Sequence, residues 1–367
     1  MTKITEVLDY LEENLDPIHI DNVKVHIKKT LNYQQTDRIA INVYRPFETG
    51  FEYYPYIEAF TDMNKMMVNE LIPCCGNPNL KADYIPMIRA NFGVGTLPSL
   101  FGLKCKVLEN NLPWVEHTDV KNIMSLLNKG VPSLQSGLGG RALETIDFYH
   151  KQLSAFPKCR DLIKIYHPDL QGPFDVAHLI WGSDIYMAVY DEPEMVHELL
   201  QLVTETYISY MKELKKVLND EDGEFNYHWG TLFPGKVLLR DDSPVVLSKD
   251  MYEEFVQPYD EQILKAFGGG SIHYCGRGDQ WVFKMMETKG LKGLNFGQPP
   301  NMEFGIDFIE KLHNGLKVHK IAVCSYYIDS KDVGRLVNSE FSTGITFSSN
   351  VNNLKEAQDI LNLVGYN

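Results

Sequence analysis

Eight short apolar runs, separated by longer segments of helical spacing, constrain the fold of this chain more than any other feature. We predict strands at 38–44, 82–92, 161–167, 236–242, 269–275, 290–296, 319–327 and 343–349. Helices are predicted among them at 192–218, 249–267, 280–288, 307–315 and 353–364. Strands that alternate with helices in this way form βα units around a parallel sheet. Eight such units fit an α/β fold of the closed (β/α)8 TIM-barrel type.

Two further helices are predicted before this alternation begins. Residues 3–15 place Ile4, Val7, Leu8 and Leu11 on one helical face, and residues 20–34 form the second helix. We therefore expect an N-terminal helical cap at 1–35 and the barrel at 36–367.

The segment 107–160 interrupts the alternation. It contains GVPSLQSGLGGR at 130–141, which is rich in Gly and Ser, followed by a run of helical composition from Ala142 to Phe156. Long irregular segments in compact domains are usually functional or mobile. We predict a loop or lid with a hinge at 130–141.

Composition excludes several classes of partner. With 44% hydrophobic residues the 367-residue chain can bury a large core, and its net charge of −14 argues against binding nucleic acid or an anionic membrane surface. No apolar run reaches transmembrane length, and Glu6 and Asp9 interrupt any secretory leader, so we expect a cytoplasmic protein. Without a leader, free thiols or metal ligands are favoured over disulfides for the cysteines at 74, 75, 105, 159, 275 and 324.

Active sites of such barrels lie at the carboxyl ends of the strands. That rule selects polar residues that end or follow the predicted strands as candidates. They are Arg45, Arg89, Asn91, His167, Asp241, Asp242, His273, Cys275, Asn295, Cys324, Tyr326, Ser348 and Ser349.

His273 and Cys275 are one residue apart on a predicted strand, so their side chains point to the same side. An imidazole and a thiolate suit zinc, which needs a third protein ligand and an open fourth position for catalysis. Cys324 is one candidate for the third ligand, and a carboxylate of Asp241 or Asp242 is another. The alternative is that Cys275 is a small buried apolar residue and His273 a hydrogen-bonded core histidine.

Asp241 and Asp242 are adjacent, so only one of the two carboxylates can point into a pocket. That carboxylate is a candidate general base, metal ligand or orienting group for His273, and a solvated turn or helix cap is the alternative. His228 lies in the aromatic run FNYHWG, which either lines a cleft or packs in the core.

Four stretches resemble the uroporphyrinogen decarboxylase superfamily in order and spacing: 85–102, 172–200, 241–263 and SIHYCGRGD at 271–279. The resemblance implies a (β/α)8 barrel. Within the superfamily, His273-Tyr274-Cys275-Gly276 looks like the HxCG motif of zinc enzymes that transfer methyl groups from methyl-corrinoid proteins to thiols. Ser348 and Ser349 stand where these enzymes have a later cysteine, so either Cys324 takes its role or the zinc site is altered.

The resemblance implies a methyltransferase that moves a methyl group between a methyl-corrinoid protein and a thiol or related small-molecule acceptor, with His273, Cys275 and Cys324 as zinc ligands. The chain has no corrinoid-binding DxHxxG motif, so the corrinoid is expected on a partner protein. The arginine-rich N-terminal motif of true decarboxylases is also missing. Two alternatives remain: a tetrapyrrole decarboxylase and a non-catalytic barrel that binds a tetrapyrrole or a corrinoid protein. Substrate contacts are expected from Arg45, Arg89, Asn91, His228 and Tyr326.

Overall fold

The computed structural model describes residues 2–44, 50–76, 80–107, 111, 113–299, 302, 304–337, 339 and 341–366. It shows a mixed α/β fold with a six-stranded parallel sheet in the order β1-β13-β12-β11-β10-β9, and a second parallel sheet that pairs β2 with β5. Each predicted strand segment overlaps one of these eight strands, and β11 and β13 extend one residue beyond the predicted ends. The eight strands are β1 (Ile41–Tyr44), β2 (Met87–Arg89), β5 (Lys164–Tyr166), β9 (Leu238–Arg240), β10 (Gly270–Cys275), β11 (Leu291–Gly297), β12 (Ala322–Tyr327) and β13 (Ile345–Asn350).

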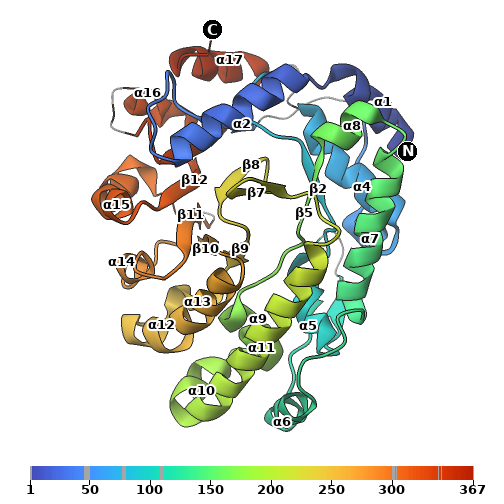
Figure 1. Cartoon of the computed structure of the whole chain (residues 1–367), viewed down its shortest axis with the longest axis vertical. Coiled ribbons are helices and arrows are strands. Elements are labelled where there is room, and N and C mark those ends of the chain that lie inside the picture. The colour runs from blue at the N-terminus through green and yellow to red at the C-terminus, as the bar shows by residue number, and fades with distance from the viewer. Residues whose placement is uncertain are drawn as a thin grey trace.

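Among the described residues, isolated contacts join the two sheets in place of strand ladders. Within the described ranges, no ladder pairs β1 with β2 or β5 with β9. The Asp83 N–H donates to the Ile41 carbonyl at 3.2 Å beside the first gap, and a single parallel bridge links Gln171 to Arg240 beside the second. In Figure 1, β2 and β5 lie across the middle of the molecule from β10, β11 and β12. The parallel arrangement is confirmed, and the closed barrel stays a prediction.

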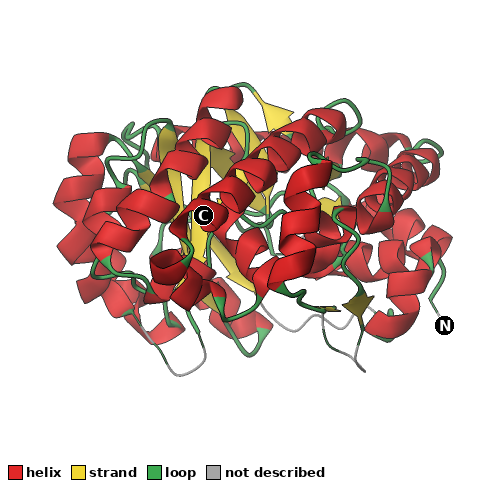
Figure 2. Cartoon of the chain, turned by 90° about the horizontal axis from the view of Figure 1, so that it is seen from below, coloured by secondary structure: helices red, strands yellow, loops and turns green. Residues whose placement is uncertain are grey.

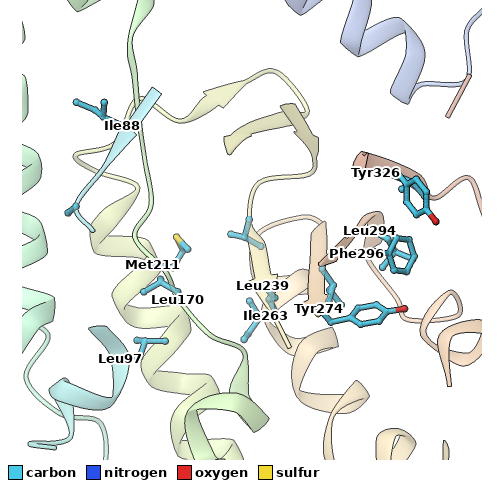
Figure 3. Packing of buried hydrophobic residues seen from close by; sticks show 14 of the residues in the cluster. Ile88, Leu97, Leu170, Met211, Leu239, Ile263, Tyr274, Leu294, Phe296 and Tyr326 are labelled. Carbon is cyan, nitrogen blue, oxygen red and sulfur yellow. The ribbon is translucent and has the colours of Figure 1, made fainter. Parts of the chain in front are cut away.

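Helices cover the outer sides of the strands, as Figure 2 shows. One large hydrophobic cluster fills the space between them, and Figure 3 shows part of it, including Leu239 of β9 and Ile263. No helix in the described part of the chain is long and apolar enough to cross a lipid bilayer. The helices are α1 (Ile4–Asn14), α2 (Pro17–Leu31), α3 (Tyr56–Thr61), α4 (Met63–Leu71), α5 (Thr96–Leu100), α6 (Val120–Lys129), α7 (Gly137–Leu153), α8 (Pro157–Leu162), α9 (Pro173–Trp181), α10 (Ile185–Asp191), α11 (Pro193–Leu214), α12 (Lys249–Phe255), α13 (Gln257–Ala266), α14 (Val282–Met285), α15 (Gly305–His319), α16 (Val333–Leu336) and α17 (Leu354–Leu363).

An antiparallel hairpin that the sequence analysis did not predict as strands occupies the interior. It consists of β7 (Phe225–His228) and β8 (Thr231–Pro234), with β6 (Glu221–Asp222) at its edge. Leu232 and Phe233 pack in a second hydrophobic cluster with Leu238 of β9 and Cys324 of β12. Figure 1 shows the hairpin lying between β12 and β2. A second, short antiparallel pair is β3 (Cys105–Lys106) with β4 (Trp114–Val115).

The two N-terminal helices are present as predicted, and both contribute to the cores of the main body. Helix α1 buries the predicted face, and α2 packs Val23 and Ile27 against the hairpin cluster. Helix α2 begins three residues earlier than predicted because Asp16 caps it, accepting the N–H groups of Ile18 and His19. The division of the chain at residue 35 stays a prediction.

The predicted loop at 130–141 is only partly a loop, because α7 already begins at Gly137. Gly139 and Gly140 are buried in its first turns. A β-carbon on Gly140 would collide with the Gln135 carbonyl, and one on Gly139 with the Leu100 side chain. These glycines therefore allow close packing within a helix, and they do not form the expected hinge.

We predict that Gly140→Ala destabilises the protein by about 1–3 kcal/mol, because the added methyl group meets backbone that cannot move aside freely. The matched control is Gly334→Ala in α16, where the new β-carbon would meet only Leu363 at 3.8 Å. That variant should gain up to about 1 kcal/mol from helix propensity. Urea unfolding measures both changes, and equal effects of the two substitutions would contradict the packing explanation.

Candidate metal site

Three side chains of metal-ligand type converge where β9 and β10 end. Asp242, His273 and Cys275 each offer one ligand atom, and these atoms lie within 4.8 Å of one another. The Cys275 Sγ is 3.5 Å from the His273 Nε2, and the Asp242 Oδ1 is 3.6 Å from the same nitrogen. Ligand atoms around a tetrahedral zinc ion are separated by roughly 3.3–3.8 Å, given bonds of about 2.0–2.3 Å. The donor types and spacing therefore fit zinc.

The neighbouring strand β11 orients His273. The Asn295 Oδ1 lies 2.6 Å from the His273 Nδ1, and the Asn295 Nδ2 donates to the Cys324 carbonyl at 2.6 Å. Because the Asn295 amide nitrogen donates to that carbonyl, the Asn295 amide oxygen faces the His273 ring and accepts the hydrogen bond from Nδ1. This assigns the free lone pair to Nε2, which faces Cys275 and Asp242. Burial lowers the pKa of His273, which favours the neutral imidazole that a metal binds.

Backbone hydrogen bonds hold Asp242 in place. The N–H groups of Asp242 and Ser243 donate to the buried carboxylate of Asp175 at 2.9 and 2.6 Å. The Cys275 N–H in turn donates to the Asp242 Oδ1 at 2.7 Å. Burial, and then the charge of Asp242, raises the pKa of Asp175 to about 7. Asp175 is thus a positioning residue for the turn that carries Asp242.

The environment of Cys275 favours the protonated thiol in the absence of a cation. Burial, followed by the neighbouring Asp242 carboxylate, raises its pKa to about 12. Metals bind the thiolate, so a divalent cation must displace this proton when it binds. A cation between the two groups would also compensate the Asp242 charge.

Asp241 points away from this group, as expected for the neighbour of Asp242. It is fully buried, and burial, followed by the charge of the buried Asp260, raises the pKa of Asp241 well above its usual value. The structure therefore corrects the candidate role of Asp241, whose side chain reaches neither the metal-ligand group nor the cavity beside it.

A cavity of about 520 Å³ lies against His273. Its wall combines aromatic and apolar side chains with uncharged amides and hydroxyls. The lining residues are Trp229, His273, Asn295, Phe296, Gly297, Gln298, Pro299, Met302, Ser325, Tyr327 and Asn350. A small ligand in this cavity would contact the His273 side of the group.

Tyr326 does not reach this cavity, because β12 is irregular at Ser325. Ser325 has φ +52°, and the pairing with β13 shifts register between Val323 and Tyr326. As a result, Ser325 and Tyr327 face the cavity, whereas Tyr326 donates to the Gly305 carbonyl at 2.7 Å. Figure 3 shows Tyr326 pointing away from the hairpin.

The Cys324 side chain is buried in the hairpin cluster and is not part of the three-residue group. The structure therefore places Cys324 outside the group, and the carboxylate of Asp242, the other candidate for the third ligand, lies beside His273 and Cys275. The β13 serines do not replace it, since the Ser348 hydroxyl donates to the Ser325 carbonyl and Ser349 is fully buried.

The remaining predicted contact residues belong to a buried polar network or lie elsewhere. Arg89 pairs with Asp169, and Arg240 contacts the same carboxylate at 2.5 Å. The His228 Nε2 lies 2.6 Å from the Arg240 guanidinium. Asn91 donates to Glu70 at 2.9 Å, and Arg45 lies outside the described residues.

Sequence reasoning missed Asp169 and Arg240. The signal for Arg240 was a cation that directly follows the apolar residues 237–239 in a predicted strand, and the signal for Asp169 was its place just after the third strand.

The lowered pKa values of two buried histidines in this network lead us to predict that the protein loses stability in acid. Burial, and then the charge of Arg240, lowers the pKa of His167 to about 3, and His228 is shifted the same way. The unfolded chain binds these protons below about pH 6.5, whereas the folded chain does not until about pH 3 for His167. Below about pH 6.5, each of the two histidines should therefore lower the free energy of unfolding by about 1.4 kcal/mol per pH unit.

Urea unfolding between pH 7 and pH 5 measures this slope. His167→Gln should reduce the slope by one histidine's contribution. An unchanged slope in that variant would contradict the assignment.

Comparisons with known proteins show the fold but no family. No protein-family model and no curated protein matches the chain. Among solved structures, a methyltransferase from Methanosarcina mazei is similar, with a TM-score of 0.63 and 15% sequence identity. The match covers 93% of this chain and 97% of that chain. At this level of identity the likeness establishes a common fold.

Proposed function

We propose that this protein is a zinc-assisted methyltransferase on a (β/α)8 barrel, of the type that its resemblance to the uroporphyrinogen decarboxylase superfamily implies. The observation that carries the proposal is the convergence of Asp242, His273 and Cys275 beside the cavity. The fold shared with a methyltransferase over nearly the whole of both chains supports it. The methyl group would come from a methyl-corrinoid on a partner protein and pass to a small thiol.

The chain's own residues supply the ligand set and its orientation. His273 would bind through Nε2 while Asn295 holds its Nδ1 proton. Cys275 would bind as thiolate, and Asp242 would bind through a carboxylate oxygen held by the turn at Asp175. Three protein ligands leave one position open, which is the arrangement of catalytic zinc. Zinc bound there would lower the pKa of an acceptor thiol, so that the thiolate forms at neutral pH.

Methyl transfer from methylcobalamin to a thiol tests the proposal. We expect the purified protein, supplied with zinc, to form the methyl thioether and release demethylated cobalamin, both followed by chromatography. Asp242→Ala should lower the rate at least about 100-fold, because removal of an essential ligand or an electrostatic group commonly costs this much. Binding of the corrinoid without turnover would instead support the non-catalytic alternative.

We further predict negligible turnover of uroporphyrinogen. The substrate's many carboxylates need cationic partners, yet Arg89 is committed to Asp169 and the cavity wall contributes no Lys or Arg among its described residues. Anaerobic incubation followed by chromatography of the porphyrin products tests this prediction. Stepwise loss of carboxylates at an enzyme-like rate would favour the decarboxylase.

A further inference from the structure

We infer that Trp229 is the specificity-determining wall of the cavity and that it selects an uncharged acceptor with a flat apolar body. The part of this inference that concerns a thiol rests on the proposed function. The part that concerns the shape and charge of the preferred ligand rests on the geometry of the hairpin tip. It therefore applies to the metal-free protein as well.

Trp229 occupies a position where a bulky residue is unfavourable. The pair His228 and Thr231 closes the β7–β8 hairpin, so Trp229 and Gly230 form a two-residue turn. Their φ angles are +44° and +79°, as a type I′ turn requires. Asn, Asp and Gly are preferred at the first of these positions, whereas a large side chain there is a backbone outlier. Such outliers gather at functional sites.

The surrounding structure holds this turn in the interior. The Ile85 N–H donates to the Gly230 carbonyl at 2.8 Å, and the Tyr44 hydroxyl donates to the Trp229 carbonyl at 3.4 Å. A β-carbon on Gly230 would collide with the Tyr84 ring, so the turn cannot be moved aside easily. The hairpin tip is thereby fixed where the Trp229 side chain reaches the cavity.

The Trp229 ring lies between the buried ion network and the candidate metal ligands. Its centroid is 4.9 Å from the His273 ring, at an interplanar angle of 74°. The Arg240 guanidinium lies over the indole, 4.8 Å from the ring centroid. Trp229 also lines the cavity and is only half-buried. A ligand that contacts His273 from the cavity would therefore also meet this ring.

The charges around the ring disfavour an ionic ligand. Arg240 already interacts with the indole, so a ligand cation would be repelled by that guanidinium. A ligand anion finds no free cation nearby, because both guanidiniums of the network already contact the Asp169 carboxylate and the described lining residues include no Lys or Arg. Trp229, Tyr327 and Met302 offer apolar contact, and the amides of Asn295, Gln298 and Asn350 suit neutral polar groups. An uncharged, flat ligand matches this wall best.

Calorimetry on metal-free protein tests the cavity with three ligands of matched shape: benzyl alcohol, phenylacetate and benzylamine. We expect benzyl alcohol to bind at least tenfold more tightly than either ion. Trp229→Phe should retain this affinity within about threefold, because a flat ring remains. Trp229→Leu should lose at least tenfold, although both variants place the same strain on the turn. Equal binding of phenylacetate or benzylamine, or no difference between the Phe and Leu variants, would overturn the inference.

Trp229→Asn separates a functional role from a structural one. Asn tolerates the left-handed backbone, so this variant should melt no lower than Trp229→Leu while binding benzyl alcohol at least tenfold more weakly than wild type. A lower melting temperature than that of Trp229→Leu would show that an apolar side chain at this position serves the fold, and would overturn the inference.

The zinc-loaded protein then distinguishes this inference from the proposed function. Benzyl mercaptan should be a better methyl acceptor than mercaptoacetate by at least tenfold, and Trp229→Leu should remove that preference. If zinc is not taken up but the metal-free ligand series behaves as expected, the proposed function fails and the Trp229 assignment stands. If methyl transfer proceeds and the preference survives in Trp229→Leu, the Trp229 assignment alone fails.

Discussion

Cys275→Ala should reduce bound zinc from about one equivalent per chain to under about a tenth, because two protein ligands remain where catalytic zinc needs three. Methyl transfer should be lost with the metal. The fold should persist, since Cys275 is only half-buried at the end of β10 and its side chain contributes little to the core. The measurement is elemental analysis of protein purified without chelator, supplied with zinc and then desalted.

Cys324→Ala is the matched control for this prediction. It removes the thiol that the sequence offered as a third ligand, but that thiol lies in the hairpin cluster away from the ligand group. We expect it to retain one equivalent of zinc. Loss of zinc in this variant, or retention of zinc in Cys275→Ala, would show that the ligand set is assigned incorrectly.

Asp169→Ala should destabilise the protein by about 3–5 kcal/mol, because it leaves the buried charges of Arg89 and Arg240 without their shared partner. Burial by itself would raise the pKa of Asp169, yet Arg240 and Arg89 hold that pKa below its usual value. The carboxylate is therefore ionised at neutral pH and is the shared anionic partner of the two cations. Urea unfolding at pH 7 gives the change in free energy.

The control for this prediction is Asp161→Ala, which removes an exposed ion pair with Arg160. Exposed pairs contribute little to stability, so unfolding should barely change. If Asp169→Ala cost no more than this control, the network would not be the buried ionic unit that we describe.

The eight strands were predictable because buried parallel strands appear as short apolar runs between helical segments. Within those strands, alternation correctly predicted that His273 and Cys275 share a side and that only one of Asp241 and Asp242 reaches them. The same rule gave the wrong orientation for Tyr326, because the irregularity at Ser325 reverses the alternation. A single residue in the left-handed region leaves no reliable signal in one sequence.

Other features depended on contacts between distant segments. The β7–β8 hairpin was not predicted, since its turn carries Trp229 in place of the usual Asn or Asp. The predicted helix at 249–267 is two helices, because Pro258 cannot continue the hydrogen bonding of α12 and the chain breaks at Val256. That Asp242 and not Cys324 lies beside His273 and Cys275 depends on the turn held by Asp175, which one sequence does not reveal.

The most direct test of the account is the absorption spectrum of the cobalt(II)-substituted protein, recorded before and after addition of benzyl mercaptan. The account predicts a thiolate-to-cobalt charge-transfer band that is absent from Cys275→Ala and shifted in His273→Ala. It predicts that the thiol increases this band, because a second sulfur enters the open position beside the cavity. A wild-type protein that binds cobalt without a charge-transfer band, or whose band does not respond to the thiol, would contradict the account.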